Sequence, residues 1–221
     1  MKLPSILLSA GLMLLAPLAS QAQNDSKYGE TEEQQLLCKE ALSVYKSYKK
    51  QKNYDEAYIQ WRKACEVCPE TASEGLYADG TSFIGKELKK VDAEDPRYAV
   101  LVDSLMYLHD KRMELYPSTK RSPNNRCVVL GRKATDFYKY NKDAHQEAYT
   151  MFKESLDCLG AEASATTLYQ YYTASFYTMK RSLKGDTLAQ SNMRAQMLTD
   201  YLNLVDYIET GVARATEAGK E

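Results

Sequence analysis

The chain has little glycine, little proline and almost no net charge. Only 10 of its 221 residues are glycine and 6 are proline, which is typical of a chain built from long helices. Lysine and arginine number 29 against 30 aspartates and glutamates, so the formal net charge is -1. Without a field of one sign, nothing in the composition attracts nucleic acid or an anionic membrane surface. We therefore expect no nucleic-acid partner.

The sequence also lacks the residue patterns that most enzymes need. It has two histidines, His109 and His145, which leave little general-base capacity near neutral pH. It contains no Gly-x-Ser-x-Gly elbow, no glycine-rich phosphate loop and no His-Glu-x-x-His zinc motif. We interpret His109 as a residue on a helix face and His145 as a solvated residue in a turn. The sequence predicts no catalytic residues, no cofactor and no metal site.

The N-terminus is typical of a secretory signal peptide over residues 1–22. Lys2 gives a positive start, an apolar run follows, and Ser20 and Ala22 are small residues at the positions that signal peptidase inspects. The run is shorter than the roughly 20 apolar residues that a membrane-spanning helix needs. We expect cleavage after Ala22, a flexible N-terminus over 23–30 and no integral membrane span in the mature chain. The expected location is the periplasm or cell envelope.

Beyond this leader, apolar residues recur at helical spacing and strand alternation is absent. Thr31 can cap the first helix, and Asp95-Pro96 is a cap followed by proline at the first helical position. The pattern predicts eight helices, over about 31–52, 55–68, 71–91, 96–117, 126–140, 143–158, 163–183 and from 187 onward. Short connections favour antiparallel pairing of neighbours within one domain spanning 31–216.

One segment of the chain is similar to a later one. Glu56-Ala57-Tyr58-x-x-Trp61 recurs as Glu147-Ala148-Tyr149-x-x-Phe152, and each copy lies about ten residues beyond a tyrosine, Tyr48 or Tyr138. Each copy is also followed by a cysteine and a helix breaker. Self-similarity of this kind indicates an array of stacked helix pairs.

The first copy resembles the tetratricopeptide repeat. That motif has a small residue, an aromatic four later, a small residue three after that and a proline five further on. The residues that satisfy these steps are Ala57, Trp61, Ala64 and Pro69. Tyr48 and Tyr54 fall where the motif has its first-helix and turn tyrosines.

The second copy departs further from the motif. Ala148 and Phe152 match it, but Ser155 and Gly160 stand in place of the later alanine and the proline. With its leader, the chain resembles tetratricopeptide proteins exported by Bacteroidota bacteria. The resemblance implies a right-handed α-solenoid of about four antiparallel helix pairs. It also implies a scaffold for protein or peptide partners rather than an enzyme.

The cysteines are placed to bridge helix ends. Cys38 opens the first predicted helix and Cys68 closes the second, while Cys127 and Cys158 do the same for the fifth and sixth. Such ends are neighbours in an antiparallel pair, and export permits disulfides. We therefore predict the bonds Cys38–Cys68 and Cys127–Cys158. Cys65, one turn before Cys68, is an alternative partner for Cys38.

The pair Cys65 and Cys68 leaves a thiol redox enzyme as a less favoured alternative. A redox dithiol opens a helix, whose N-terminus lowers the thiol pKa, whereas this pair closes one. Pro69 follows the pair where covalent haem attachment requires histidine.

The favoured interpretation is therefore an exported scaffold that mediates protein-protein or protein-peptide interaction, because stacked helix pairs leave a face where a peptide can lie. The candidate partner-binding residues are first-helix positions not needed for packing, namely Tyr45, Lys49, Tyr138 and Lys142. The alternative is a structural or assembly subunit whose last helix docks on further repeats or on another chain through Met193, Met197 and Tyr201. The sequence leaves the partner and the oligomeric state open.

Overall fold

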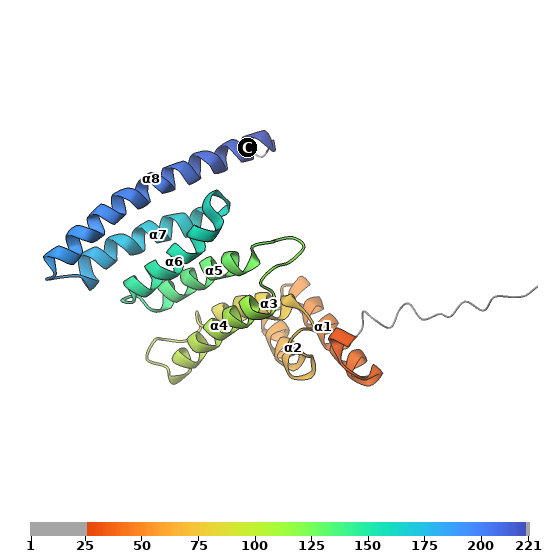
Figure 1. Ribbon diagram of the computed structural model, residues 1–221. Helices are drawn as coiled ribbons and strands as arrows, with labels where there is room; N and C mark the ends of the chain where they lie inside the picture. Colours follow the sequence, from red (N-terminus) through yellow and green to blue (C-terminus); the bar gives the residue numbers. More distant parts are fainter. Residues whose placement is uncertain (1–25, 220–221) are drawn as a thin grey trace, which may run out of the picture.

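The computed structural model describes residues 26–219, and this part of the chain is an all-α solenoid with no β-strand (Figure 1). Its eight helices are α1 (Glu32–Lys50), α2 (Tyr54–Val67), α3 (Glu74–Glu87), α4 (Pro96–Leu115), α5 (Asn125–Tyr140), α6 (His145–Leu159), α7 (Ala165–Tyr177) and α8 (Thr187–Glu217). Helices that are adjacent in sequence pack against each other, so α1 and α8 lie at opposite ends of the array. The predicted fold class is confirmed.

Capping side chains fix where the helices begin. Thr31 and Gln34 form a capping box at α1, in which the Thr31 hydroxyl accepts from the Gln34 amide at 3.2 Å. Five other caps accept a hydrogen bond from a first-turn amide, at the starts of α2, α3, α4, α7 and α8. They are Asn53, Ser73, Asp95, Ser164 and Asp186.

Two helices are shorter than the sequence pattern predicts. The pattern predicts a helix over 71–91, but α3 begins after its cap Ser73 and ends at Glu87. It also predicts a helix over 163–183, but α7 ends at Tyr177 and Thr178–Ser182 continue as a π-helix. The spacing of apolar residues stays nearly helical through a π-helical segment. It therefore does not show where the backbone hydrogen bonds change from the α-helical to the π-helical spacing.

The repeated segment supplies buried small and aromatic residues to the core. The buried members of its two copies are Ala57, Trp61, Ala64, Ala148, Phe152 and Ser155. Tyr48 packs partly buried against the first cluster. Pro69 follows directly after Cys68, the extended residue that ends α2. Tyr54 is more exposed, and the Lys86 ammonium lies 3.8 Å from the centroid of its ring.

Trp61 joins the first helix pair to the second. Its indole N–H donates to the Leu76 carbonyl of α3 at 2.8 Å, and its ring lies against Gly80. A Cβ at position 80 would lie 2.4 Å from Trp61 Cζ2, so only glycine leaves room for the ring. Tyr58 stacks on the indole with ring centroids 5.8 Å apart, and Phe83 contacts it at 5.9 Å.

Gly131 allows a similar close approach in the second half of the chain. A Cβ at position 131 would lie 2.8 Å from Ser155 Oγ and 3.2 Å from Thr167 Oγ1, so α5 lies very close to α6 and α7. The Ser155 hydroxyl donates to the Cys127 carbonyl at 2.9 Å. The serine that replaces the second alanine of the repeat is therefore hydrogen-bonded although it is fully buried.

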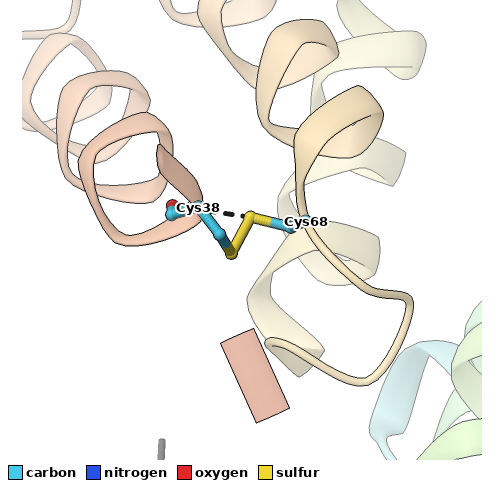
Figure 2. The surroundings of a disulfide bond; sticks show 2 residues. All are labelled: Cys38 and Cys68. Carbon is cyan, nitrogen blue, oxygen red and sulfur yellow. Dashed lines mark hydrogen bonds between the residues drawn. A yellow bond between two sulfur atoms is a disulfide. The ribbon is translucent and has the colours of Figure 1, made fainter. Parts of the chain in front are cut away.

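Two disulfides join the helix ends, and they are the predicted pairs. Figure 2 shows Cys38 of α1 bonded to Cys68 at the end of α2, with Cα atoms 4.8 Å apart. Cys127 of α5 is bonded to Cys158 of α6, with Cα atoms 6.2 Å apart. Cys65 is left as a free thiol. Each bond therefore ties together the two helices of one antiparallel pair.

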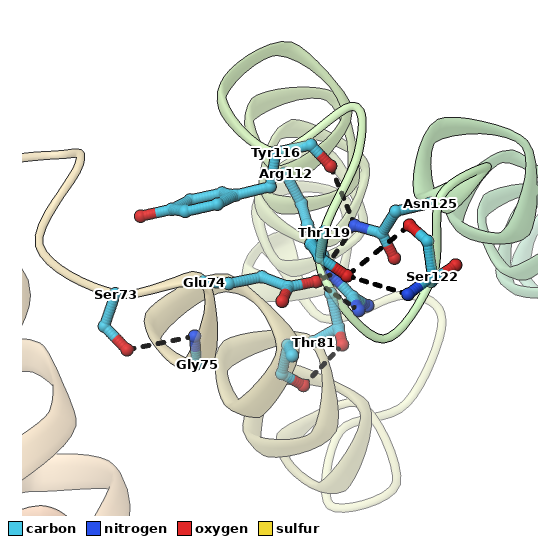
Figure 3. A network of polar contacts seen from close by, with 10 residues as sticks. Ser73, Glu74, Gly75, Thr81, Arg112, Tyr116, Thr119, Ser122 and Asn125 are labelled. Atoms are coloured by element: carbon cyan, nitrogen blue, oxygen red, sulfur yellow. Dashed lines mark hydrogen bonds and ion pairs between the residues drawn. The ribbon is translucent and has the colours of Figure 1, made fainter.

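A polar cluster holds the second pair of helices to the third (Figure 3). Arg112 of α4 donates from Nε and Nη2 to one carboxylate oxygen of Glu74 in α3, at 3.0 and 2.8 Å. Asn125, the first residue of α5, donates to the same oxygen at 3.0 Å and to the Tyr116 carbonyl at 2.8 Å. Arg112 and Asn125 are buried, so these charge-assisted bonds replace the water that both lose.

The predicted signal peptide, residues 1–22, lies outside the described residues. The part of the expected flexible N-terminus that is described begins with a 3-10 turn, Ser26–Tyr28, and the partly buried Tyr28 packs against the core of the first helices. Between residues 26 and 219, no helix has the length and apolar character that a membrane span requires.

Gly80→Ala tests the contact between Trp61 and α3. We expect the free energy of unfolding to fall by about 1–2 kcal/mol, because overpacking against the indole outweighs the ~1 kcal/mol that alanine gains over glycine within a helix. Urea unfolding provides the measurement. The matched control is Gly85→Ala in the same helix, where the nearest atom to a new Cβ is the Tyr140 hydroxyl at 4.0 Å. This control should stabilise the protein by about 0.5–1 kcal/mol. Equal gains from both variants would contradict the packing described.

Removal of the Cys127–Cys158 bond by a double alanine substitution tests the helix-end bridges. The bond spans 31 residues, for which the loop-entropy model predicts a loss of about 3–4 kcal/mol. Chemical denaturation and non-reducing peptide mapping provide the measurement. Cys65→Ala is the control and should leave both bonds in place and change stability by no more than about 0.5 kcal/mol. Peptides that join Cys65 to Cys38 would contradict the pairing.

Candidate functional site

An open groove with a volume of about 550 Å³ lies between α2 and α4. α2 packs against α1 and α3, but its backbone does not reach α4, so part of α3 forms the floor of the space between them. We call this the α2–α4 groove. It is lined by Tyr58, Trp61, Arg62, Cys65, Glu66, Cys68, Pro69, Glu70, Leu76, Tyr77, Ile84, Val100, Leu101, Ser104, Tyr107 and Leu108.

The groove has an apolar floor and charged edges. Leu76 and Ile84 of α3 are buried beneath it. On α4, the side chains of Val100 and Tyr107 are 63% and 54% exposed, which is unusual for large apolar residues that line a cavity. Its volume falls in the range of protein ligand sites. Such a surface gains stability when another apolar surface covers it.

Charged residues border the groove along α2. Arg62 and Glu66 line it from the exposed side of that helix. Beyond the end of α2, Glu70 forms an ion pair with Lys111 of α4 at 3.2 Å, which connects the α2 side of the groove to the α4 side. The Tyr77 hydroxyl donates to the Glu70 carbonyl at 3.0 Å. The edges therefore carry both signs of charge and do not select a ligand of high net charge.

Cys65 places a free thiol in the same groove. Its neighbours exclude water from the thiol, although the residue as a whole is exposed, and together with the charge of Glu66 this raises the pKa of Cys65 to about 12. The thiol is therefore protonated at neutral pH and is a poor nucleophile. Cys68, the other half of the Cys-x-x-Cys spacing, is bonded to Cys38. The two sulfurs do not form a dithiol pair in this structure.

The predicted first-helix residues do not line this groove. The prediction that Tyr45 is not needed for packing is wrong: its side chain is fully buried and meets Phe83 edge-on, with ring centroids 6.5 Å apart. Lys49 is partly exposed, but its ammonium forms an ion pair with Asp79 of α3. Both side chains reach the second helix pair, since their partners Phe83 and Asp79 belong to α3.

In the second half of the chain, Tyr138 is partly buried and its ring contacts Phe152 edge-on at 6.4 Å. Lys142 is exposed in the connection between α5 and α6. His145 is not solvated as predicted, because it is buried at the start of α6. Its imidazole stacks on Tyr177 with centroids 5.3 Å apart, and its Nδ1 lies 3.1 Å from the Tyr138 hydroxyl. The π-helix that follows Tyr177 brings Arg181 over the same ring at 4.9 Å.

His109 lies on the face of α4 that packs against α5. It is 2% exposed, and its Nε2 lies 2.8 Å from a carboxylate oxygen of Asp136. The pair bridges two helices in the manner of a structural hydrogen bond. Over residues 26–219, no group of three histidine, cysteine or acidic side chains is arranged to hold a metal ion.

Sequence reasoning missed the groove because it assigned the binding face to the first helix of each pair. A signal was present in α4, where Leu101, Leu105 and Leu108 occupy one face while Val100 and Tyr107 lie two turns apart on another. Two apolar faces on one helix indicate two packing partners. Comparison with models of protein families, with curated proteins and with solved structures finds no match to the chain.

The buried His145 predicts a pH dependence of stability. Burial lowers its pKa from the ordinary 6.5, the charge of Arg181 lowers it further, and Asp143 and Glu147 act in the opposite direction. Because the unfolded chain then takes up the proton first, the free energy of unfolding should fall as the pH drops from about 6.5 to the lower folded-state pKa. His145→Phe keeps an aromatic ring beside Tyr177 and should flatten this slope. The measurement is urea unfolding of both proteins between about pH 7.5 and about pH 4.5, a range that brackets the ordinary histidine pKa. Equal slopes of unfolding free energy against pH for the two proteins would contradict the assignment.

Proposed function

We propose that this protein is an exported helical-repeat scaffold that binds a protein or peptide segment in the α2–α4 groove. The observation that supports the proposal is the apolar groove itself, in which Val100 and Tyr107 are more than half exposed beside the buried Leu76 and Ile84. Solvent contact with such a surface is unfavourable, and covering it contributes about 25 cal/mol for each Å² of apolar area removed from water.

The form of the groove favours an amphipathic segment as its occupant. An apolar floor requires an apolar face, and the charged residues Arg62 and Glu66 at the edge require polar flanks. The groove is open, so a partner segment can lie in it as a helix or as an extended strand. The partner we propose is therefore a peptide segment with one apolar face and polar edges of mixed charge.

Three further features support a scaffold in the cell envelope. The two disulfides are bonds that persist in oxidising compartments. The leader over residues 1–22 has the features of a signal peptide. The repeated segment has the small and aromatic positions of a tetratricopeptide repeat, a class of repeats whose faces bind peptides, and the structure buries these positions.

Site-specific photo-crosslinking in the producing cell tests this proposal. A photoreactive phenylalanine analogue replaces Tyr107 in the groove or, as a control, Leu36, an apolar residue of α1 that is 66% exposed and outside the groove. We expect a discrete crosslinked species from position 107 and none from position 36. The fragment attached at position 107 should be an amphipathic peptide segment, which mass spectrometry of the crosslinked peptide identifies.

A matched pair of aspartate variants shows whether the groove is the cause. Val100→Asp places a charge in the groove, whereas Leu36→Asp places one on α1 at an equally exposed apolar position. Val100→Asp should reduce the crosslink at position 107 at least about tenfold, since one buried charge costs more than 1.4 kcal/mol. The Leu36 variant should leave it unchanged. Peptide binding in the groove would be refuted if the crosslink at position 107 survived Val100→Asp. It would also be refuted if no crosslink formed at position 107 in the chain that keeps Val100.

A further inference from the structure

The last helix carries a long row of exposed apolar side chains. Leu198, Tyr201, Leu202, Ile208 and Val212 of α8 are between 50% and 64% exposed. With the partly exposed Val205, they cover roughly 120° of the helix circumference, at 3.6 residues per turn. We call these six residues the α8 row. An apolar stripe of this width is typical of a face that a helix buries against a neighbour.

The inward face of α8 is fixed separately, and the row lies on another side of the helix. Met197 and Leu204 are buried on the side that faces the array. Asp200 is buried between them, and it accepts hydrogen bonds from the Tyr149 hydroxyl of α6 at 3.0 Å and from Gln196 at 2.8 Å. Of the predicted docking face, Met197 is thus part of the core, and Tyr201 is exposed beside Tyr172 of α7, with ring centroids 6.1 Å apart.

The spacing of the row is that of a helix that pairs with another helix. Leu198, Tyr201, Val205, Ile208 and Val212 follow one another at intervals of three, four, three and four residues. This alternation is the heptad seam of a coiled coil, in which each side chain inserts between residues of the facing helix. α8 is 31 residues long and lies beside α7 (Figure 1), and among the described elements only α7 and the short helical turns at the two ends of α7 lie close to the backbone of α8.

Charges at the two ends of the row indicate what that helix is. Arg194 lies on the same side of α8, one turn before Leu198, and Glu209 lies there near the other end. Neither side chain forms a hydrogen bond or ion pair within the described residues. If a second α8 runs antiparallel to the first, Arg194 of each copy lies within reach of Glu209 of the other, twice in one symmetric interface. A parallel arrangement would place like charges together.

We propose that the protein forms a two-fold symmetric dimer in which the α8 rows of two copies pair antiparallel. In this register, Leu198 lies opposite Ile208 of the second copy and Tyr201 lies opposite Val205, which makes four apolar layers about the two-fold axis. The ion pairs between Arg194 and Glu209 border these layers on both sides. The same patch on both copies is then self-complementary, as a two-fold symmetric interface requires. The dimer does not depend on peptide binding in the α2–α4 groove, so each idea can fail alone.

Sedimentation equilibrium on the full chain recovered from the producing cell tests the pairing. The parent protein should be a dimer at micromolar concentration. Leu198→Asp should yield a monomer with an unchanged circular dichroism spectrum, because position 198 is exposed in the isolated fold. The matched control is Leu188→Asp, which alters a residue of α8 that is 71% exposed but lies off the row. This variant should remain dimeric.

Charge reversal tests the orientation. Arg194→Glu and Glu209→Arg should each weaken the dimer about tenfold, because each places two like-charge contacts at the interface. The double variant that carries both changes should recover most of the parent affinity. A monomeric parent chain would overturn the proposed dimer and would mean that the α8 row does not bind a second copy of this chain. A dimer that Leu198→Asp leaves intact, or a double variant as weak as the single ones, would overturn the proposed pairing.

Discussion

The contact between Trp61 and Gly80 determines where the second helix pair lies on the first. The indole ring occupies the space that any other residue at position 80 would fill, and its N–H is bonded to the Leu76 carbonyl one turn earlier in α3. Since a lost hydrogen bond and a lost packing contact would both result from a shift of α3, the junction has one stable arrangement. The floor of the α2–α4 groove is built on the same contact, because Trp61 and Leu76 both line it.

The sequence alone predicts those features that depend on local spacing. Helix periodicity, capping residues and the positions of Ala57 and Ala148 follow from regular intervals along the chain, and the structure buries both alanines. The cysteine pairs could be predicted because each joins the ends of one antiparallel pair. The burial of Tyr45 and His145 could not, since it depends on Phe83 and Tyr177, which come from other helix pairs. The groove depends on a missing contact between α2 and α4, and the second apolar face of α4 at Val100 and Tyr107 is a local sign of the groove that does not show which helix is absent.

Two unoccupied apolar surfaces follow from one property of the fold. In a stacked array, each helix pair covers its neighbours, and apolar side chains stay exposed where the stacking is interrupted or where it ends. The interruption between α2 and α4 gives the groove around Val100 and Tyr107, and the last described helix carries the α8 row. Binding of a peptide segment in the groove and pairing through α8 would therefore leave each other's surfaces free.

Hydrogen exchange of the Trp61 indole N–H tests the central contact most directly. The chain has a single tryptophan, so its indole proton gives one resonance that needs no further assignment. The bond to Leu76 is buried, and the account predicts that this proton exchanges only when the protein unfolds globally, with a protection free energy equal to that of the slowest core amides. Exchange at the rate of free tryptophan in an otherwise folded protein would contradict the account.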